Sequence, residues 1–232
     1  MLTPDGRVVM VSGASRGIGR AVAERLRADG FRLSLGARDP ASLADLAGPE
    51  VLTHAHQAES RASAEAWVQA TAARFGRLDG LVNNAGMGAM ARLEDDDDAF
   101  EKLHQVNTMG PLRLIRAALP HLRRAGTGRI VNVISLSGKR VTNDNAGYAM
   151  SKFAALALSH AVRRAGWDDG VRVCAVCPGF VATEMTAGVT AVARDEMILP
   201  ADLASLIRTV LLLPDTAVVS ELLVNARFEP ML

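Results

Sequence analysis

Short apolar runs alternate with longer amphipathic segments along the chain. The runs are rich in Val, Ile and Leu and are mostly bounded by Gly, Pro or Asp, as strands are. They predict strands at residues 7–12, 31–37, 51–55, 78–83, 129–135, 171–177 and 219–225. Several runs are apolar at nearly every position, which is typical of parallel strands that helices cover on both faces.

Helices are predicted between these strands, at residues 17–29, 60–75, 97–124, 147–164 and 201–213. The longest one should break or kink near Gly110-Pro111, because proline disrupts a helix interior. Regular alternation of strand and helix predicts an α/β fold of the Rossmann type, a doubly wound, mostly parallel sheet of seven strands. No repeat, linker or composition break divides the chain, so residues 1–232 are interpreted as a single domain.

Composition narrows the class of protein. Hydrophobic residues make up 49% and charged residues 22% of the 232 residues, and the net charge is +1. These values exclude a disordered chain, and they give no bulk charge for binding nucleic acid or an anionic membrane. No apolar run reaches 18 residues, so no membrane span is expected. Two cysteines exclude a disulfide scaffold and favour a reducing, cytoplasmic location.

Three patterns that resemble metal sites have simpler explanations. The acidic run at residues 94–98 suits a helix start, where carboxylates complement the helix dipole. Cys174 and Cys177 lie three apart on a predicted strand, so they should face opposite sides. His54 and His56 have no evident third ligand. No metal site is therefore predicted.

The first predicted strand runs directly into the sequence SGASRGIG. Its glycines are spaced G-x3-G-x-G, and such a loop lets a pyrophosphate approach the backbone at a helix N-terminus. A tight turn that binds nothing would also need glycine, but the position between first strand and first helix favours a nucleotide. The candidate cofactor contacts here are Gly13, Ser15, Arg16, Gly17, Ile18 and Gly19.

The end of the second strand indicates the type of nucleotide. NAD-binding folds place an acidic residue there for the ribose 2′-hydroxyl, whereas this chain has Gly36, Ala37 and Arg38. Arg16 within the glycine loop is a second guanidinium that could reach a 2′-phosphate. The sequence therefore predicts NADP(H). After the fourth strand, Asn84, Ala85 and Gly86 suit the cofactor crevice, although an asparagine-rich turn explains them equally well.

The one tyrosine of the chain, Tyr148, stands four residues before Lys152 on a predicted helix. That spacing puts both side chains on one helix face. A nearby ammonium should lower the tyrosine pKa and make the phenol a usable acid and base. Ser135 lies thirteen residues earlier, at the end of the fifth strand. The chain has only three lysines, so a lysine and a serine at these two distances from the one tyrosine are not expected by chance.

Together, SGASRGIG, the Asn83–Gly86 stretch NNAG, Asn107, Ser135, Tyr148-Ala-Met-Ser-Lys152 and PGFVAT resemble the short-chain dehydrogenase/reductase family, in its compact, NADP-preferring branch. The resemblance covers nearly the whole chain. It implies that Tyr148 protonates a carbonyl oxygen as hydride arrives from the nicotinamide. It further implies that Lys152 lowers the tyrosine pKa and bonds the ribose, that Ser135 stabilises the oxygen, and that Asn107 holds a water. The stretch along the nicotinamide would supply Pro178, Gly179, Val181 and Thr183.

Two features depart from the family pattern. Gln57 stands where many members have an aspartate for the adenine, and an amide can still bond that base. Residues 222–230 lack the glycine-rich tail of many members, which puts the tetramer contacts of such tails in doubt. The resemblance still implies a homodimer or homotetramer formed through helices 97–124 and 147–164.

The function expected is NADPH-dependent reduction of a small ketone or aldehyde to an alcohol, or the reverse oxidation. The alternative is a catalytically silent NADP(H)-binding sensor, which would not need Ser135, Tyr148 and Lys152. A sugar-nucleotide epimerase or dehydratase is disfavoured by the glycine spacing and the short chain. Residues 137–147 and 184–199 are expected to recognise the substrate, which the sequence does not identify.

Overall fold

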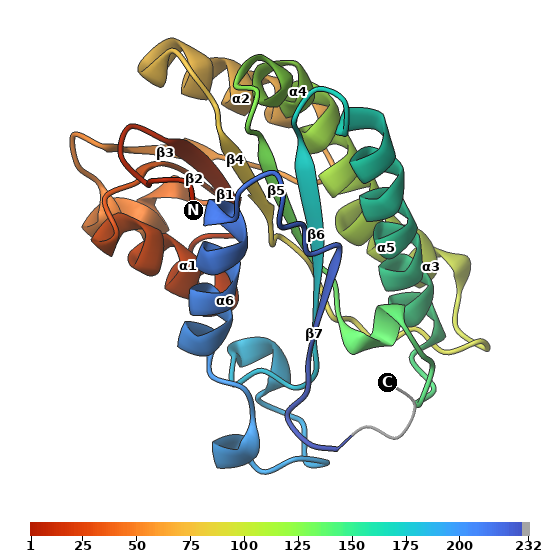
Figure 1. The fold of residues 1–232 in the computed structure, drawn as a ribbon. Coiled ribbons are helices and arrows are strands. Elements are labelled where there is room, and N and C mark those ends of the chain that lie inside the picture. Colours follow the sequence, from red (N-terminus) through yellow and green to blue (C-terminus); the bar gives the residue numbers. More distant parts are fainter. Residues whose placement is uncertain (229–232) are drawn as a thin grey trace.

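A twisted seven-stranded sheet runs through the centre of the computed structural model, which describes residues 1–228 (Figure 1). The strand order is β3-β2-β1-β4-β5-β6-β7, and every neighbouring pair is parallel. The strands are β1 (Val8–Ser12), β2 (Arg32–Ala37), β3 (Val51–Ala55), β4 (Gly80–Asn83), β5 (Arg129–Val133), β6 (Arg172–Pro178) and β7 (Glu221–Val224). The predicted fold class is confirmed, with a sheet that is fully parallel.

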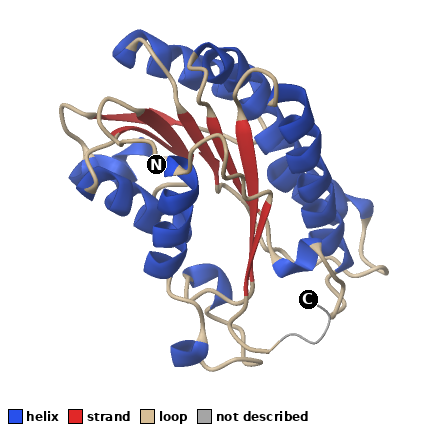
Figure 2. Cartoon of the chain, viewed as in Figure 1, coloured by secondary structure: helices blue, strands red, loops and turns tan. Residues whose placement is uncertain are grey.

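Helices cover both faces of the sheet (Figure 2). On one face lie α1 (Gly17–Ala28) and α6 (Pro200–Leu212), and on the other α2 (Arg61–Phe75), α4 (Gly110–Arg124) and α5 (Ala146–Gly166). Strand β1 divides its side chains between the two layers. Val9 and Val11 join the core with α1 and α6, whereas Val8 and Met10 join the core with α2, α4 and α5. Alternate residues of a strand face opposite sides of the sheet. Because helices cover both sides, the side chains on both faces of β1 are apolar.

The long helix predicted at residues 97–124 is divided in two. Helix α3 (Asp97–His104) passes through a π-helical turn, Gln105–Met109, into α4. The Gly110 amide donates to the Gln105 carbonyl, five residues back. The predicted break near Gly110-Pro111 is therefore a π-bulge, and Pro111 lies in the first turn of α4, where a missing N–H is harmless.

Short helical turns escaped the sequence analysis because they span too few residues for a period to show. They are η1 (Pro40–Leu46), η3 (Leu136–Gly138), η4 (Glu184–Thr186) and η5 (Arg194–Glu196). For η1 a signal existed, since Asp39-Pro40 pairs a capping side chain with a proline in the first turn.

The acidic run does begin a helix, with Asp97 and Asp98 in the first turn of α3. Cys174 and Cys177 belong to different hydrophobic clusters, as their spacing predicts. Burial raises the thiol pKa of Cys174 to about 12 and that of Cys177 to about 11. Within residues 1–228, no group of three or more His, Cys, Asp and Glu side chains is arranged to hold a metal ion. No helix in that range has the length and apolar character to cross a membrane. Residues 229–232, which include the end of the tail discussed above, lie outside the described residues.

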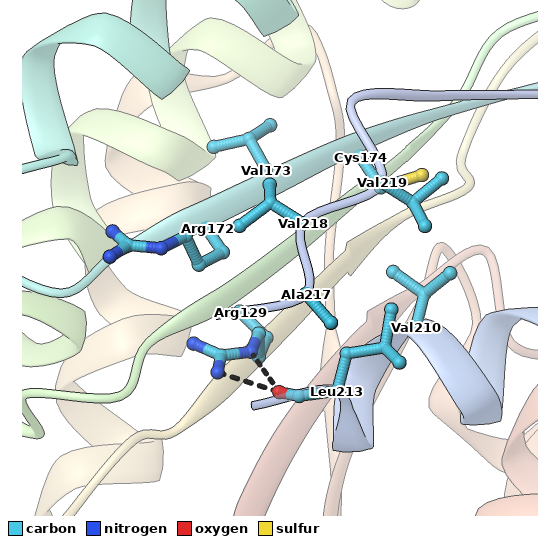
Figure 3. A pocket seen from close by; sticks show the side chains of 9 residues that line it. All are labelled: Arg129, Arg172, Val173, Cys174, Val210, Leu213, Ala217, Val218 and Val219. Atoms are coloured by element: carbon cyan, nitrogen blue, oxygen red, sulfur yellow. Dashed lines mark hydrogen bonds between the residues drawn. The ribbon is translucent and has the colours of Figure 1, made fainter. Parts of the chain in front are cut away.

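A small hollow, with room for about one water molecule, lies near the start of β5 and β6, at the amino end of the sheet (Figure 3). The buried Arg129 guanidinium donates to the Leu213 carbonyl at 2.8 Å and pairs with Asp215 at 2.8 Å. Its remaining bonds go to the carbonyls of Gly128 and Gly170. Arg129 thus ties the loop after α6 to the sheet, and this accounts for its burial.

The order of the strands reverses between β1 and β4. From β1 the chain adds β2 and β3 on one side, and from β4 it adds β5, β6 and β7 on the other. Ligands of doubly wound sheets bind at the carboxyl ends of the strands where this reversal occurs. The loops after β1 and β4 are therefore the place where a ligand is expected to bind.

Gly36 in β2 tests the packing of the core. A Cβ atom built on Gly36 would lie 2.5 Å from the ring of Trp67, which is fully buried and donates from its indole nitrogen to Ser34 Oγ at 2.8 Å. We expect Gly36→Ala to lower the free energy of unfolding by about 1–3 kcal/mol through overpacking. Urea unfolding measures this, with Gly48→Ala as the control because no atom lies within 4 Å of its Cβ position. Equal losses in both variants would contradict the expectation.

Candidate active site

The loops after β1 and β4 are bonded to each other at the reversal point. Ser12 Oγ accepts hydrogen bonds from the backbone N–H groups of Asn84 and Ala85, both at 3.0 Å. The Asn84 side-chain amide donates in return to the carbonyls of Ser12 and Gly13, both at 3.1 Å. The Asn84 amide therefore shapes the glycine loop, and the explanation of this stretch as an ordinary turn is insufficient.

Two glycines of the loop are required by this close approach. Gly13 has φ of +64°, in the left-handed region that favours glycine. A Cβ atom on Gly19 would collide with the Gly13 carbonyl oxygen and with Asn84 Nδ2. The result is a shallow backbone cradle that larger residues would fill, as a bound pyrophosphate requires.

Helix α1 begins at Gly17, directly behind the cradle. Arg16 occupies the N-cap position, and its side chain makes no capping bond. No side chain among residues 1–228 caps this helix start, so the first-turn N–H groups, including those of Ile18 and Gly19, are available to an anion. Ser15 lies half-buried in the same loop.

The end of β2 carries no carboxylate directed at a ribose. Arg38 follows the strand, is exposed, and pairs with no carboxylate of residues 1–228. The nearest acid in sequence, Asp39, uses its side chain to accept from the Ala41 N–H at 2.9 Å at the start of η1. Gln57, expected near the adenine, is exposed after β3. This arrangement suits a phosphate at Arg38 better than a 2′-hydroxyl.

Ser135, Tyr148 and Lys152 meet beside this crevice. Ser135 lies two residues past the end of β5, and its hydroxyl accepts from the Ser137 N–H at 3.0 Å and interacts with the Tyr148 phenol. Tyr148 and Lys152 lie one turn apart on α5, with Lys152 Nζ 5.6 Å from the centre of the tyrosine ring. The buried Nζ donates to the Val133 carbonyl at 3.1 Å.

Burial dominates the proton affinities of this group. It raises the pKa of Tyr148, and the Ser135 hydroxyl acts in the opposite direction without reversing it. The expected lowering of the tyrosine pKa by Lys152 is therefore wrong for the structure described. The ammonium is aimed at the Val133 carbonyl instead of the phenol oxygen. Burial also lowers the pKa of Lys152 to about 8, because the charged form loses its hydration.

Asn107, which was expected to hold a water molecule, forms hydrogen bonds to protein groups. Its amide donates to the Met87 carbonyl and to Ser151 Oγ, both at 3.0 Å, and its Oδ1 accepts from the Met87 N–H at 2.9 Å. The side chain thus holds the loop after β4 against α5. Gly86 lies between, since a Cβ there would be 3.2 Å from Asn107 Oδ1 and 3.8 Å from Lys152 Nζ. The side chain is bonded to protein, so a water-holding role for Asn107 stays a prediction.

The segment after β6 lies on the other side of the crevice. The Gly179 N–H, next to buried Pro178, donates to the Val224 carbonyl of β7 at 2.8 Å. Val181 is buried and bridges to Ile198. These bonds carry the chain to Thr183, whose Cγ2 would lie 3.2 Å from a Cβ built on Gly17. The segment thereby reaches the glycine loop.

Two residues that contribute to the site were missed by the sequence analysis. Ser12 was noted only as part of the loop sequence, although its hydroxyl organises Asn84 and Ala85. Asn145 caps α5, accepting from the Tyr148 N–H at 3.3 Å and the Ala91 N–H at 3.0 Å, while it donates to the Ala89 carbonyl at 3.1 Å. A signal for Asn145 existed, because asparagine is a favoured N-cap residue just before a helix.

Comparison with known proteins agrees with this geometry. Residues 7–193 match the sequence family described as short chain dehydrogenase. The chain belongs to the short-chain dehydrogenase family. The resemblance stated from the motifs is thereby confirmed, and the members of this family are oxidoreductases.

Several relatives of this short-chain dehydrogenase carry the names of reductases. An agropine synthesis reductase of Rhizobium rhizogenes is 45% identical over 217 residues, which is 91% of this chain and 50% of that protein. The chain thus spans about half the length of the first curated relatives it matches. A levodione reductase of Leifsonia aquatica is 34% identical, covering 77% of this chain and 71% of the relative.

Solved short-chain dehydrogenase structures superpose closely on the chain. An alcohol dehydrogenase from the archaeon Thermococcus sibiricus, complexed with 5-hydroxy-NADP, gives a TM-score of 0.86 at 32% identity and covers 94% of this chain and 95% of its own. A 3-ketoacyl-(acyl-carrier-protein) reductase from Brucella melitensis, complexed with NADH, gives 0.89 at 26% identity, with 97% and 98% covered. The shared architecture therefore extends over nearly the whole chain.

The lowered pKa of Lys152 is directly measurable. The chain has three lysines, so Nζ resonances of protein labelled with ¹⁵N-lysine are few, and the one absent from Lys152→Met is assigned at once. We expect it to titrate near pH 8. The folded-state pKa lies below the unfolded value, so the unfolded chain binds more protons between these two values, and this lysine should make stability rise with pH there. A midpoint at the ordinary value of 10.5 would contradict the burial argument.

Proposed function

We propose that this protein reduces a ketone or aldehyde to an alcohol with NADPH, or catalyses the reverse oxidation. The observation that carries the proposal is the meeting of Ser135, Tyr148 and Lys152 beside the nucleotide cradle. In the reduction, hydride adds to the carbonyl carbon and a proton adds to the oxygen. Carbonyl, NADPH and a proton thus give alcohol and NADP⁺.

Each of the three residues has a role that its surroundings support. The Tyr148 phenol is protonated at neutral pH, as its raised pKa ensures, and donates the proton to the carbonyl oxygen. The Ser135 hydroxyl bonds that oxygen and stabilises its developing charge. The Lys152 ammonium, held near the Tyr148 ring by its bond to the Val133 carbonyl, bonds the nicotinamide ribose.

NADP(H) supplies the hydride when bound. The uncapped start of α1 and the cradle at Gly13 and Gly19 suit its pyrophosphate. The remaining contacts are assigned to Ser15, Gly17, Ile18, Asn84, Ala85, Gly86, Pro178, Gly179, Val181 and Thr183. Among residues 1–228, Arg38 pairs with no carboxylate and Asp39 is occupied as a cap, which supports the 2′-phosphate form.

The substrate is a small carbonyl compound or the corresponding alcohol. The relatives are named for different compounds, so their names support the reaction class and leave the compound open. Residues 137–147 and 184–199 flank the site and differ in character from the buried strands, since most of their side chains are exposed or half-buried. These two segments are proposed to select the substrate.

A homodimer or homotetramer is proposed to form through the helices at residues 97–124 and 147–164. Met150 and Phe153 on α5 support this assembly, because these apolar residues are exposed to 61% and 41%, respectively. Such exposure on one helix is common at protein interfaces.

Removing the phenol oxygen tests the reaction. We expect Tyr148→Phe to lower kcat for NADPH oxidation, measured with a panel of ketones and aldehydes, by about 100-fold or more, because the proton donor is lost. NADPH affinity should change little. If the wild type binds NADPH and no carbonyl compound is turned over, the sensor alternative gains support; an active Tyr148→Phe would refute the role of the phenol.

The Asn145 amide offers a test of how the site is positioned. Asn145→Asp keeps both acceptor bonds and the helix cap but loses the donor to the Ala89 carbonyl. We expect its free energy of unfolding to stay within about 0.5 kcal/mol of the wild type, while kcat/KM falls about tenfold as the loop after β4 loosens. Asn145→Ala should lose activity and about 1 kcal/mol of stability. A fully active Asn145→Asp would show that the bond to Ala89 is dispensable.

A further inference from the structure

Arg16, a proposed ligand of the 2′-phosphate, already has an acidic partner. Its Nη1 lies 2.5 Å from Glu184 Oε2, although the two residues are 168 positions apart in the sequence. Both side chains are largely exposed, 64% for Arg16 and 70% for Glu184. Of the carboxylates in residues 1–228, Glu184 is the one with which Arg16 forms an ion pair.

The backbone holds Glu184 beside the glycine loop. The preceding residue, Thr183, packs over Gly17, and its carbonyl accepts from Arg194 Nη1 at 2.9 Å. Thr186 Oγ1 accepts from the Thr183 N–H at 3.2 Å and closes the turn from the other side. The position of the carboxylate is therefore set by the turn η4 and does not depend on the arginine alone.

The same turn also reaches the loop after β4. A Cβ atom built on Gly88 would lie 3.0 Å from Met185 Sδ, so Met185 packs directly over that glycine. The turn η4 thus touches both loops that are proposed to hold the nucleotide. Glu184 occupies the side of the turn that faces the glycine loop.

We propose that Glu184 is a specificity-determining residue, which reduces the preference for NADPH over NADH by competing with the 2′-phosphate for Arg16. This inference rests on the proposed nucleotide function. A 2′-phosphate can bind the Arg16 guanidinium only when the ion pair between Arg16 and Glu184 breaks. NADH has no 2′-phosphate, so its binding does not require this ion pair to break. Arg38 has no competing carboxylate in the described chain, so it carries the preference while Glu184 restrains the contribution of Arg16.

Nucleotide binding tests the proposal without any need for turnover. Dissociation constants of NADPH and NADH are measured from the change in nicotinamide fluorescence on binding. We expect Glu184→Gln to bind NADPH about two- to fivefold more tightly, the range of a weak exposed ion pair, and NADH unchanged. Glu65→Gln is the control, because Glu65 is an exposed glutamate of α2, outside the segments assigned to nucleotide and substrate, and its side chain forms no ion pair within residues 1–228. It should leave both constants unchanged.

The Arg16→Ala variant shows whether Glu184 acts by competing for Arg16 or by the general effect of its negative charge on nucleotide binding. Arg16→Ala should weaken NADPH binding, and adding Glu184→Gln to it should change nothing further, since the competition has been removed. If Glu184→Gln tightens both nucleotides equally, or leaves their ratio unchanged, the proposal is overturned while the proposed function stands. If the wild-type protein binds neither nucleotide, the proposed function fails and this inference fails with it.

Discussion

The close approach of the loops after β1 and β4 is the constraint on which the rest of the site depends. One serine hydroxyl accepts two backbone N–H groups, and one asparagine amide returns two bonds to the glycine loop. There is no space for a side chain at Gly19 inside this contact. The backbone cradle at Gly13 and Gly19 follows from it. The parallel pairing of β1 with β4 brings these two loops together.

Burial sets the proton affinities of Tyr148 and Lys152. It favours the neutral form of each group, so the pKa of the phenol rises and that of the ammonium falls. The ordinary pKa values of lysine and tyrosine in water are similar, and burial moves those of Lys152 and Tyr148 apart. Lys152 therefore releases its proton before Tyr148 does. A site of this kind keeps the phenol protonated at neutral pH.

The fold also separates a firmly held part of the site from a loosely held one. The residues that meet at the carboxyl ends of β1, β4 and β5 are held by the sheet and its covering helices. The segment from the end of β6 to α6 is held mainly by short turns and a single bridge, Val181 to Ile198. Loops positioned by a rigid scaffold are where specificity usually resides. Relatives named for different compounds fit this division.

The sequence alone was enough for the architecture, because both signals it depends on are local. Unbroken apolar runs such as Val8–Ser12 demand two covered faces, and glycines that follow the first strand mark its turn into α1. The spacing of Tyr148 and Lys152 is likewise a property of one helix.

Tertiary structure decided what those residues touch. The partners of Asn84, Asn107 and Asn145 come from other elements, and no spacing encodes them. The direction of the Tyr148 pKa shift depends on how much water the packed site excludes, and it is opposite to the one that the Tyr148–Lys152 spacing predicts. The pairing of Arg16 with Glu184 joins residues 168 positions apart. Local periodicity determines elements, whereas contacts between distant segments exist only once the sheet has assembled.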